Sequence, residues 1–216
     1  MFQKLTEYKH IIWDWNGTLL DDAWLCVEVM NGMLAKRGLP TVNLEFYRSV
    51  FTFPMRDYYQ ELGYDFTKEP FEEVGMEFMD LYNQRQKECR LHTEVIGVLE
   101  TLRQKGYGQS ILSAREQTEL ITETLDLGVN AYFTKVYGLA DHYAHGKTDV
   151  GKKLIRDLGL PFSSLLFIGD TRHDAEVANE IGIDCILIPN GHHSEERLRA
   201  CRFPVIPGLN DLIAGL

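Results

Sequence analysis

The sequence of 216 residues predicts an α/β fold in which helices cover a parallel sheet and a helical segment is inserted after the first strand. From about residue 94 onward, short apolar runs alternate with segments of helical period, which is typical of parallel strands joined by helices. Residues 21–92 break this alternation and contain no strand candidate. A glycine follows each predicted helix of the second half, where a C-terminal glycine belongs: Gly106, Gly128, Gly159 and Gly182.

The expected strands are short and apolar on both faces, as strands buried inside a parallel sheet should be. They are His10–Trp13, Gln109–Leu112, Val136–Tyr137, Leu165–Ile168 and Cys185–Ile188. Apolar residues at three-to-four spacing predict the helices between them. These helices are Val95–Lys105, Glu116–Leu127, Asp149–Leu158 and Ala175–Ile181.

The inserted segment has two apolar stripes at helical spacing, which we expect to form its own core. The stripes are Leu25, Val29, Met30, Met33 and Leu34, and then Phe71, Val74, Phe78, Leu81 and Tyr82. Between them, the stretch Tyr47–Leu62 is aromatic and less regular. We place the linkers near Leu19–Asp22 and Cys89–Glu94. The expected domains are therefore a core of residues 1–20 and 93–216 and a helical cap of residues 21–92.

The charge balance restricts the partners. There are 32 acidic against 22 basic residues, a formal net charge of −10, so the chain should repel nucleic acid and anionic membrane surfaces. We therefore expect neither as a partner. An anionic substrate would need a locally positive pocket or a bound cation. Nothing in the sequence predicts an oligomeric state.

The cysteines and the first residues indicate a compartment. Cys26, Cys89, Cys185 and Cys201 form no C-x-x-C pair, so we expect neither a zinc site nor a disulfide framework. The start, Met1 to Trp13, lacks the apolar stretch of a signal peptide, and no run approaches the length of a membrane span. The sequence-based expectation is a cytoplasmic protein.

Residues with chemical potential stand where the predicted strands end. Asp14, Ser113 and Asp170 follow three strands, and Lys147 lies in the loop ahead of a helix. Ligands of open parallel sheets bind beyond the carboxyl ends of the strands, so these groups should converge. Two close carboxylates repel unless a cation or proton lies between them, and Mg²⁺ prefers oxygen ligands. Lys147 and Ser113 would contact the oxygens of a phosphate.

The residues after Asp14 suit phosphoryl transfer. Gly17 permits a tight turn that exposes backbone N–H groups to an anion. A carboxylate at position 14 could attack phosphorus and form an aspartyl-phosphate. Asn16 could offer its backbone carbonyl to the metal.

Four segments together resemble the motifs of the haloacid dehalogenase superfamily. Asp14–Thr18 resembles its D-x-D-G-T motif, Ser113 the second motif, Lys147 the third, and Gly169–Asp174 the fourth, G-D-x-x-x-D. They occur in the family's order and span nearly the whole chain. The insertion resembles the helical cap of the branch that contains phosphoglycolate phosphatase and β-phosphoglucomutase.

The resemblance implies a Rossmann-like core with a cap, Mg²⁺ as cofactor and a small phosphorylated metabolite, such as phosphoglycolate, as substrate. Asp14 would be the nucleophile and a magnesium ligand, with the Asn16 carbonyl and Asp170 as further ligands. Asp174 would orient a metal-bound water or Lys147. The remaining implied phosphate contacts are Ser113, the N–H of Ala114, and Lys147. Arg56, in a predicted turn of the cap, would reach a substrate carboxylate when the cap closes.

The chain departs from the pattern at Asn16, where the family's phosphatases have an aspartate that protonates the leaving oxygen and then activates water. An amide cannot shuttle a proton at neutral pH, and such help is worth roughly 10²–10⁴-fold in rate. Three interpretations follow: a slower phosphatase favouring good leaving groups, an enzyme whose proton comes from the substrate or another group such as His173, or a phosphate-binding protein without turnover. We favour the slower phosphatase.

A phosphosugar mutase and a dehalogenase have weaker support. A mutase of the same branch also depends on the missing aspartate, and Lys147 suits a phosphate site better than a dehalogenase. Lys152 and Lys153 rival Lys147 but lie within a helical pattern. A metal site is not expected at His142, His145, His192 and His193, which are interpreted as exposed loop residues.

Overall fold

The computed structural model describes residues 5–140, 146–214 and 216. The strands are β1 (His10–Trp13), β2 (Leu20–Asp21), β3 (Arg90–Leu91), β4 (Gly108–Glu116), β5 (Lys135–Leu139), β6 (Leu165–Gly169) and β7 (Asp184–Leu187). The helices are α1 (Ala23–Lys36), α2 (Leu44–Val50), α3 (Met55–Glu61), α4 (Phe71–Arg85), α5 (Val95–Gln104), α6 (Gln117–Asp126), α7 (Lys147–Leu158), α8 (Arg172–Ile181), α9 (Glu195–Arg199) and α10 (Leu209–Ile213). Short 3₁₀ helices span Leu5–Glu7, Gln86–Glu88, Asn130–Tyr132 and Phe162–Ser164.

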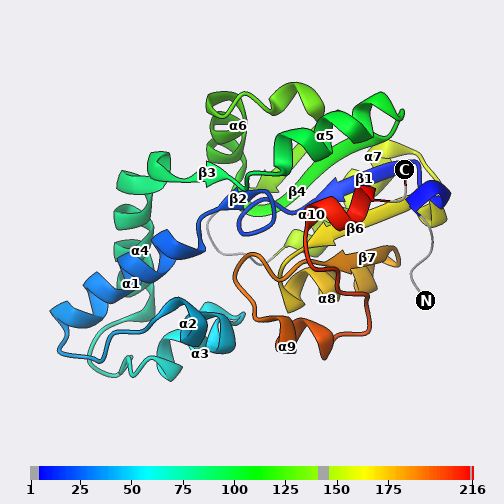
Figure 1. Cartoon of the computed structure of the whole chain (residues 1–216). Coiled ribbons are helices and arrows are strands. Elements are labelled where there is room, and N and C mark those ends of the chain that lie inside the picture. Colours follow the sequence, from blue (N-terminus) through cyan, green and yellow to red (C-terminus); the bar gives the residue numbers. More distant parts are fainter. Residues whose placement is uncertain (1–4, 141–145, 215) are drawn as a thin grey trace.

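Within the described residues, five strands form one parallel sheet in the order β5-β4-β1-β6-β7. The first strand of the chain is therefore the central one, paired with β4 on one side and β6 on the other (Figure 1). The predicted fold class, an α/β protein with a parallel sheet, is confirmed. The strand order places the ends of β1, β4 and β6 side by side.

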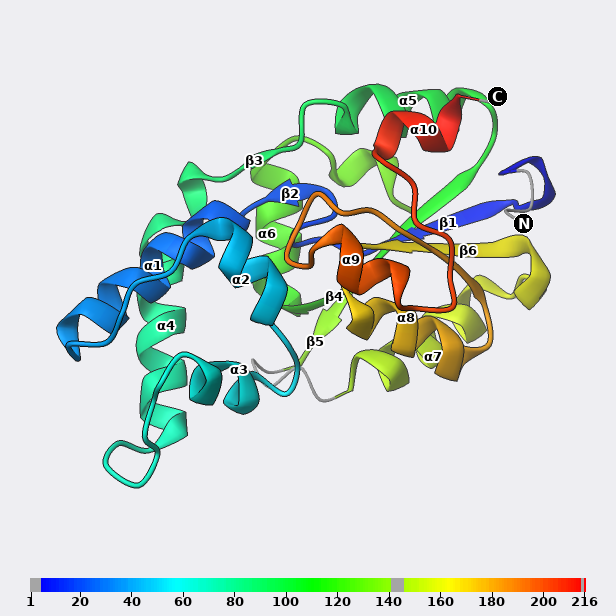
Figure 2. The ribbon, with the colours of Figure 1, turned by 60° about the horizontal axis from the view of Figure 1, so that its bottom comes forward.

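Successive residues of the central strands enter different apolar clusters. Ile11 and Trp13 of β1 belong to the cluster that contains α5, α6 and α10, whereas Ile12 belongs to the one that contains α7, α8 and α9. This alternation follows from the two-residue period of a strand. Figure 2 shows α5 and α10 on one side of the sheet and α7, α8 and α9 on the other. Because helices cover both faces of the sheet, the edge formed by the strand ends is where a ligand can bind.

The inserted segment is helical, but its two linkers pair with one another. Helices α1 to α4 run between β2 and β3 and lie beside the sheet in Figures 1 and 2. The expectation of no strand near residues 21–92 is wrong, because β2 and β3 form a two-stranded antiparallel ribbon with Leu20 opposite Leu91 and Asp21 opposite Arg90. Strands of two residues are too short for sequence periodicity to reveal. The ribbon ties both linkers together.

We call residues 21–92 the cap, a boundary that stays a proposal. The cap does not have a separate apolar core. Leu25, Met30 and Tyr47 of the cap belong to the same buried cluster as Ile11 and Val98 of the sheet layer. The stripe expected in α1 is buried, whereas in α4 only two members of the expected stripe are fully buried, Val74 and Tyr82. Residues 47–62, uncertain from sequence, form most of α2 and α3.

Two element boundaries differ from expectation near the strand ends. β4 continues to Glu116, with a register shift against β5 between Leu112 and Glu116, so Ser113 lies within it. Lys147 is the first residue of α7, not a residue of the preceding loop. Gly146, at φ 121°, precedes it, and a positive φ of this kind favours glycine. Within the described residues, no helix is long and apolar enough to cross a membrane.

Candidate active site

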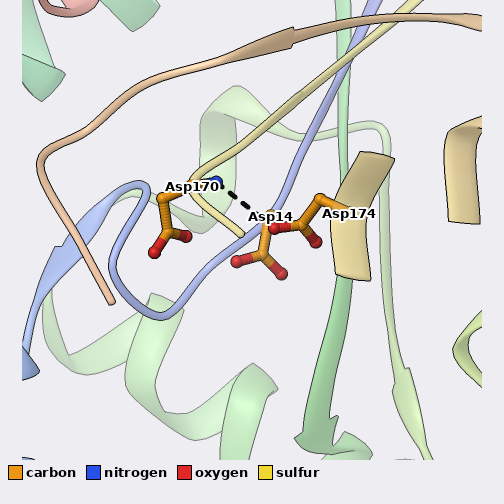
Figure 3. Close-up of side chains that lie close together, drawn as sticks. All are labelled: Asp14, Asp170 and Asp174. Atoms are coloured by element: carbon orange, nitrogen blue, oxygen red, sulfur yellow. Dashed lines mark hydrogen bonds between the residues drawn. The ribbon is translucent and has the colours of Figure 1, made fainter. Parts of the chain in front are cut away.

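Asp14 lies directly beyond the central strand. Its backbone N–H donates to the carbonyl of Ile168 on β6 at 2.8 Å, which continues the sheet pairing by one residue. Asp170 follows β6, and Asp174 lies on the first turn of α8. Figure 3 shows the three carboxylates gathered in one place, with Asp14 and Asp170 on neighbouring chain segments and Asp174 reaching from the helix. One oxygen of each lies within 4.8 Å of the other two.

Lys147 holds two of these carboxylates. Its ammonium nitrogen lies 2.5 Å from Asp14 Oδ1 and 2.6 Å from Asp174 Oδ1. The lysine side chain is 3% exposed, so both ion pairs are shielded from water. A buried charge of this kind is retained only with partners, because isolated burial is costly. The structure therefore brings the predicted phosphate-binding lysine and the predicted nucleophile into direct contact.

Asp174 also fixes the turn that carries Asp170. Its Oδ2 accepts hydrogen bonds from the backbone N–H groups of Asp170 and Thr171, at 3.2 and 2.9 Å. The Thr171 hydroxyl accepts in return from the N–H of Asp174, forming a capping box at the start of α8. The second acid of the G-D-x-x-x-D segment thus orients both Lys147 and the Asp170 loop.

Two glycines allow the chain to pass closely around Asp170. A Cβ atom on Gly17, at φ +76°, would lie 2.4 Å from Asp170 Oδ2, and one on Gly191 would lie 2.0 Å from it. The carboxylate itself accepts from the Thr18 hydroxyl at 2.8 Å and from the backbone N–H of His192 at 2.7 Å. The position of Asp170 therefore depends on the lack of a side chain at both glycines.

Burial and like charge disfavour ionisation of the acids. Burial raises the pKa of Asp14 to about 8; Lys147 opposes the rise, and Asp174 and Asp170 add to it. Burial also raises the pKa of Asp170 to about 6, with the charge of His192 acting in the opposite direction. Burial alone would raise the pKa of Asp174, but Lys147 outweighs it and holds that pKa below its usual range. A further positive charge close to the three carboxylates would therefore favour their ionised forms.

The residues present fit a divalent cation. The clustered donors are all carboxylate oxygens, which Mg²⁺ prefers, and a cation would remove the repulsion between them. Asp14 and Asp170 lie just beyond two adjacent strands, and Figure 3 shows their carboxylates close together. The geometry by itself therefore supports an oxygen-lined cation site next to a lysine.

Comparison with known proteins gives a family-level match. The family model described as haloacid dehalogenase-like hydrolase matches residues 11–188. The chain belongs to the haloacid dehalogenase-like hydrolase family. The match runs from β1 to just beyond β7 and includes all four predicted motifs.

Relatives of this family member are phosphatases by name. The chain is 24% identical over 216 residues to a phosphoglycolate phosphatase of Pseudomonas syringae pv. tomato, covering 96% of this chain and 79% of that one. It is 28% identical over 201 residues to an N-acetylmuramic acid 6-phosphate phosphatase of Pseudomonas putida, covering 87% and 86%. These likenesses and the family match indicate a phosphoric monoester hydrolase.

The fold has a close counterpart among solved structures. A haloacid dehalogenase-like family hydrolase from Streptococcus pneumoniae superposes with a TM-score of 0.82 at 21% identity, covering 97% of this chain and 98% of that one. Both the sheet and the cap therefore have counterparts in that chain. Phosphatases of the haloacid dehalogenase family generally use Mg²⁺, and the three aspartates here could bind a metal ion.

The other predicted phosphate contacts lie at the end of β4. Ser113 is buried, and its Oγ accepts from the backbone N–H of Arg115 at 3.1 Å, which leaves its hydroxyl hydrogen available as a donor. Ala114 is half-buried next to it. Their contact with phosphate stays a prediction.

Arg56 has other partners in this structure. It is exposed, and its guanidinium carbon lies 4.9 Å from the ring centroid of Phe66 and 5.8 Å from that of Phe71, both in the cap. These contacts give no support to a role at the aspartates. Its contact with a substrate carboxylate stays a prediction.

Sequence reasoning missed a buried polar group next to the loop that joins β1 to β2. The interpretation of His192 and His193 as exposed is wrong: they are 6% and 1% exposed. His192 Nε2 lies 3.3 Å from Asp22 Oδ1, and its Nδ1 lies 2.7 Å from the Tyr47 hydroxyl. Burial alone would lower the pKa of His192, but the charge of Asp22 outweighs it and raises that pKa to about 9. His142 and His145 lie outside the described residues.

Gly17→Ala should strongly reduce phosphatase activity, because the positive φ at this position is strained for alanine and the new methyl group would overlap Asp170 Oδ2. We expect a loss of roughly 10²-fold or more, since misplacement of a reacting group by about 1 Å has that effect. The measurement is kcat/KM for p-nitrophenyl phosphate with Mg²⁺.

Gly97→Ala is the matched control. A Cβ at Gly97 would meet nothing within 4 Å, and the residue lies inside α5. We expect unchanged activity and a gain of about 0.5–1 kcal/mol in the free energy of unfolding. Equal activity of the two variants would contradict the role assigned to Gly17.

Proposed function

We propose that the chain is a Mg²⁺-dependent phosphatase that hydrolyses a small phosphorylated metabolite through an aspartyl-phosphate on Asp14. The observation that carries the proposal is the Lys147 ammonium between Asp14 and Asp174, with Asp170 alongside. A site of this composition combines a nucleophile, a cation site and a positive charge for the transferred phosphoryl group.

The chain's own groups divide the reaction among them. The Asp14 carboxylate attacks phosphorus, and the bond from phosphorus to the leaving oxygen breaks as the acyl phosphate forms. Lys147 and the hydroxyl of Ser113 contact the equatorial phosphoryl oxygens, where charge gathers in the transition state. Water then attacks the phosphorus of the aspartyl-phosphate, which releases phosphate and restores Asp14.

The residues that would hold Mg²⁺ are Asp14, Asp170 and the backbone carbonyl of Asn16, with Asp174 orienting Lys147. When bound, the ion neutralises the carboxylates and the phosphate, so that an anionic nucleophile can approach an anionic group. This requirement is acute in a protein whose net charge is −10.

Asn16 determines which leaving groups suit the site. Its amide cannot donate a proton to a leaving alkoxide at neutral pH. His173, the proton donor that the sequence offers in its place, has its pKa lowered by burial and by the charge of Lys147, and its ring packs 4.9 Å from that of Phe53. A lowered pKa reduces the fraction of this imidazole that carries a second proton to donate at neutral pH. The site therefore favours acyl and aryl phosphates, or substrates that supply their own proton.

The substrate class is a small phosphorylated acid or sugar. Phosphoglycolate and N-acetylmuramic acid 6-phosphate, named in two relatives, both combine a phosphate with a carboxylate. A panel of such metabolites, assayed for phosphate release with Mg²⁺, ranks them by kcat/KM.

Hydrolysis of p-nitrophenyl phosphate and acetyl phosphate should require Mg²⁺ and Asp14. We expect Asp14→Asn to lose at least roughly 10³-fold in kcat, because the amide cannot attack phosphorus. Phosphate release is measured with Mg²⁺ and after chelation by EDTA. The control is Asp126→Asn, a surface residue of α6 that should leave turnover unchanged. Tight binding of phosphate esters without turnover would instead indicate a phosphometabolite-binding protein.

Turnover should depend steeply on the leaving group. We expect kcat/KM for acetyl phosphate to exceed that for an alkyl phosphate such as glycerol phosphate by roughly 10²–10⁴-fold, the usual worth of general acid catalysis. A series of phenyl phosphates of graded phenol pKa measures the slope. A flat series would show that a proton donor other than residue 16 is present.

Mg²⁺ should bind more tightly as pH rises from about 6 to 8. Raised pKa values, to about 8 for Asp14 and about 6 for Asp170, mean that the metal-free carboxyl groups hold protons below those values. The cation must displace these protons. Its affinity therefore falls, as the pH is lowered, by up to about tenfold per pH unit for each proton released. Calorimetry in two buffers of different ionisation enthalpy counts the protons. Because Asp170 titrates at the lower end of this range, an affinity that is constant from pH 6 to 8 would contradict the assignment of Asp14 as a ligand.

A further inference from the structure

We call residues 14–19, which join β1 to β2, the catalytic loop. The side chain of Asn16 in this loop contacts Asp22, just ahead of α1, and Tyr82 of α4. Its amide nitrogen donates to Asp22 Oδ2 at 2.8 Å and lies 3.2 Å from the Tyr82 hydroxyl. The same hydroxyl donates to Asp22 Oδ2 at 2.9 Å. Asn16, Asp22 and Tyr82 therefore form a closed triangle of hydrogen-bonding groups at the position where the family's phosphatases have an acid.

Asp22 is the centre of this arrangement. It is 1% exposed, and its second oxygen accepts from the backbone N–H of Gly17 at 2.9 Å and lies 3.3 Å from His192 Nε2. The two oxygens of Asp22 thus contact groups of the catalytic loop, the cap and the loop after β7. A buried carboxylate with donors on both oxygens has a tightly restricted orientation.

Tyr82, the member of the triangle that belongs to the cap, is held in place by further contacts. The Tyr82 ring on α4 lies 5.1 Å from the guanidinium carbon of Arg115, which follows Ser113 by two residues on β4. Arg115 also donates to Asn83 Oδ1 at 3.0 Å, and it pairs with Glu123 at 2.9 Å. Tyr82 therefore cannot move away from Asn16 without disturbing contacts at the end of β4.

We propose that Asp22 is a positioning residue for the catalytic loop: it holds the Asn16 amide next to the Tyr82 hydroxyl, and the Asn16 amide and the Asp22 carboxylate form a complementary pair. This inference rests on the proposed phosphatase function for its kinetic test. It goes beyond the leaving-group preference, which follows from the amide at position 16 alone, by assigning to Asp22 the orientation of that residue.

The pair is complementary because an amide donates where a carboxylate accepts. An aspartate at position 16 would place two carboxylates about as close as the present 2.8 Å contact. The Tyr82 hydroxyl, which has one hydrogen and already donates to Asp22, could not donate to both. Repulsion would turn the new carboxylate away from Asp22. An asparagine at position 22 would restore a donor and draw the carboxylate at position 16 back to residue 22.

Three variants test the pair: Asn16→Asp, Asp22→Asn and the double variant. The measured quantity is the ratio of kcat/KM for glycerol phosphate to kcat/KM for acetyl phosphate, which isolates proton donation to the leaving group. We expect Asn16→Asp to raise this ratio by about tenfold or more, because the repelled carboxylate becomes free to act as an acid. The double variant should return to within about threefold of the parent ratio.

The double variant is decisive because it carries the same aspartate at position 16. A ratio equally raised with and without Asp22→Asn would overturn the proposal, as would a ratio in Asn16→Asp that is unchanged or lowered. Asp22→Asn alone should leave the ratio unchanged while lowering kcat/KM for acetyl phosphate. The double variant should recover that loss, a rescue that a merely space-filling role does not predict.

A spectroscopic measurement tests the contact without any turnover. The side-chain amide resonances of Asn16, identified by their loss in Asn16→Asp, should exchange slowly with solvent in the parent and at least about tenfold faster in Asp22→Asn. Asp126→Asn, on the exposed surface of α6, is the control and should leave them unchanged. Equal exchange in the parent and in Asp22→Asn would overturn the proposal. If the parent fails to hydrolyse acetyl phosphate, the proposed function fails while this measurement still decides the role of Asp22.

Discussion

Repulsion among buried carboxylates is the constraint on which the candidate site depends. Asp14, Asp170 and Asp174 are at most 6% exposed, and one oxygen of each lies within 4.8 Å of the others. A single ammonium, that of Lys147, contacts two of them. Breaking a buried pair of this kind is typically destabilising by about 3–5 kcal/mol. The remaining negative charge favours a cation between the carboxylates, and in the proposed function that cation would in turn hold a phosphate.

The strand order is what brings the charged side chains together. β1 lies between β4 and β6, so the chain segments leaving these three strands meet at one edge although they are far apart in sequence. Asp14 is held by a backbone hydrogen bond to β6, and Asp170 by Thr18 and His192. Because these supports are mostly backbone or short side chains, little conformational freedom remains to be lost when a substrate binds.

The sequence predicts the parts of the site whose residues carry a local signal. Asp14 before Asn-Gly, and Asp170 and Asp174 in G-D-x-x-x-D, each combine an apolar strand with a motif, and the structure brings them together. The fold class follows from the same alternation. The start of α7 at Lys147 was missed because Gly146 and the residues before it give no helix signal.

The contacts of Asp22 and His192 could not be predicted from the sequence. They join residues from opposite ends of the chain and depend on how the cap lies against the core. No periodicity reports such a contact, and a histidine after glycine is most simply interpreted as exposed. The two-residue strands β2 and β3 were missed for a related reason, since their pairing is a tertiary event. One signal was available for Asp22: an acid next to another acid at the start of an apolar helix.

The β2–β3 ribbon bears on whether the protein can be dissected. Asp21 and Arg90 already face each other across it, so a chain spliced from one to the other would need almost no spanning segment. Such a minimal core would nevertheless cut through the buried apolar cluster that contains Trp15 and Leu19 and continues into α1 and α4. The insertion could therefore be removed without interrupting the sheet, but it shares its apolar core with the sheet layer. Its excision would expose an apolar surface, prone to aggregation, next to the aspartates.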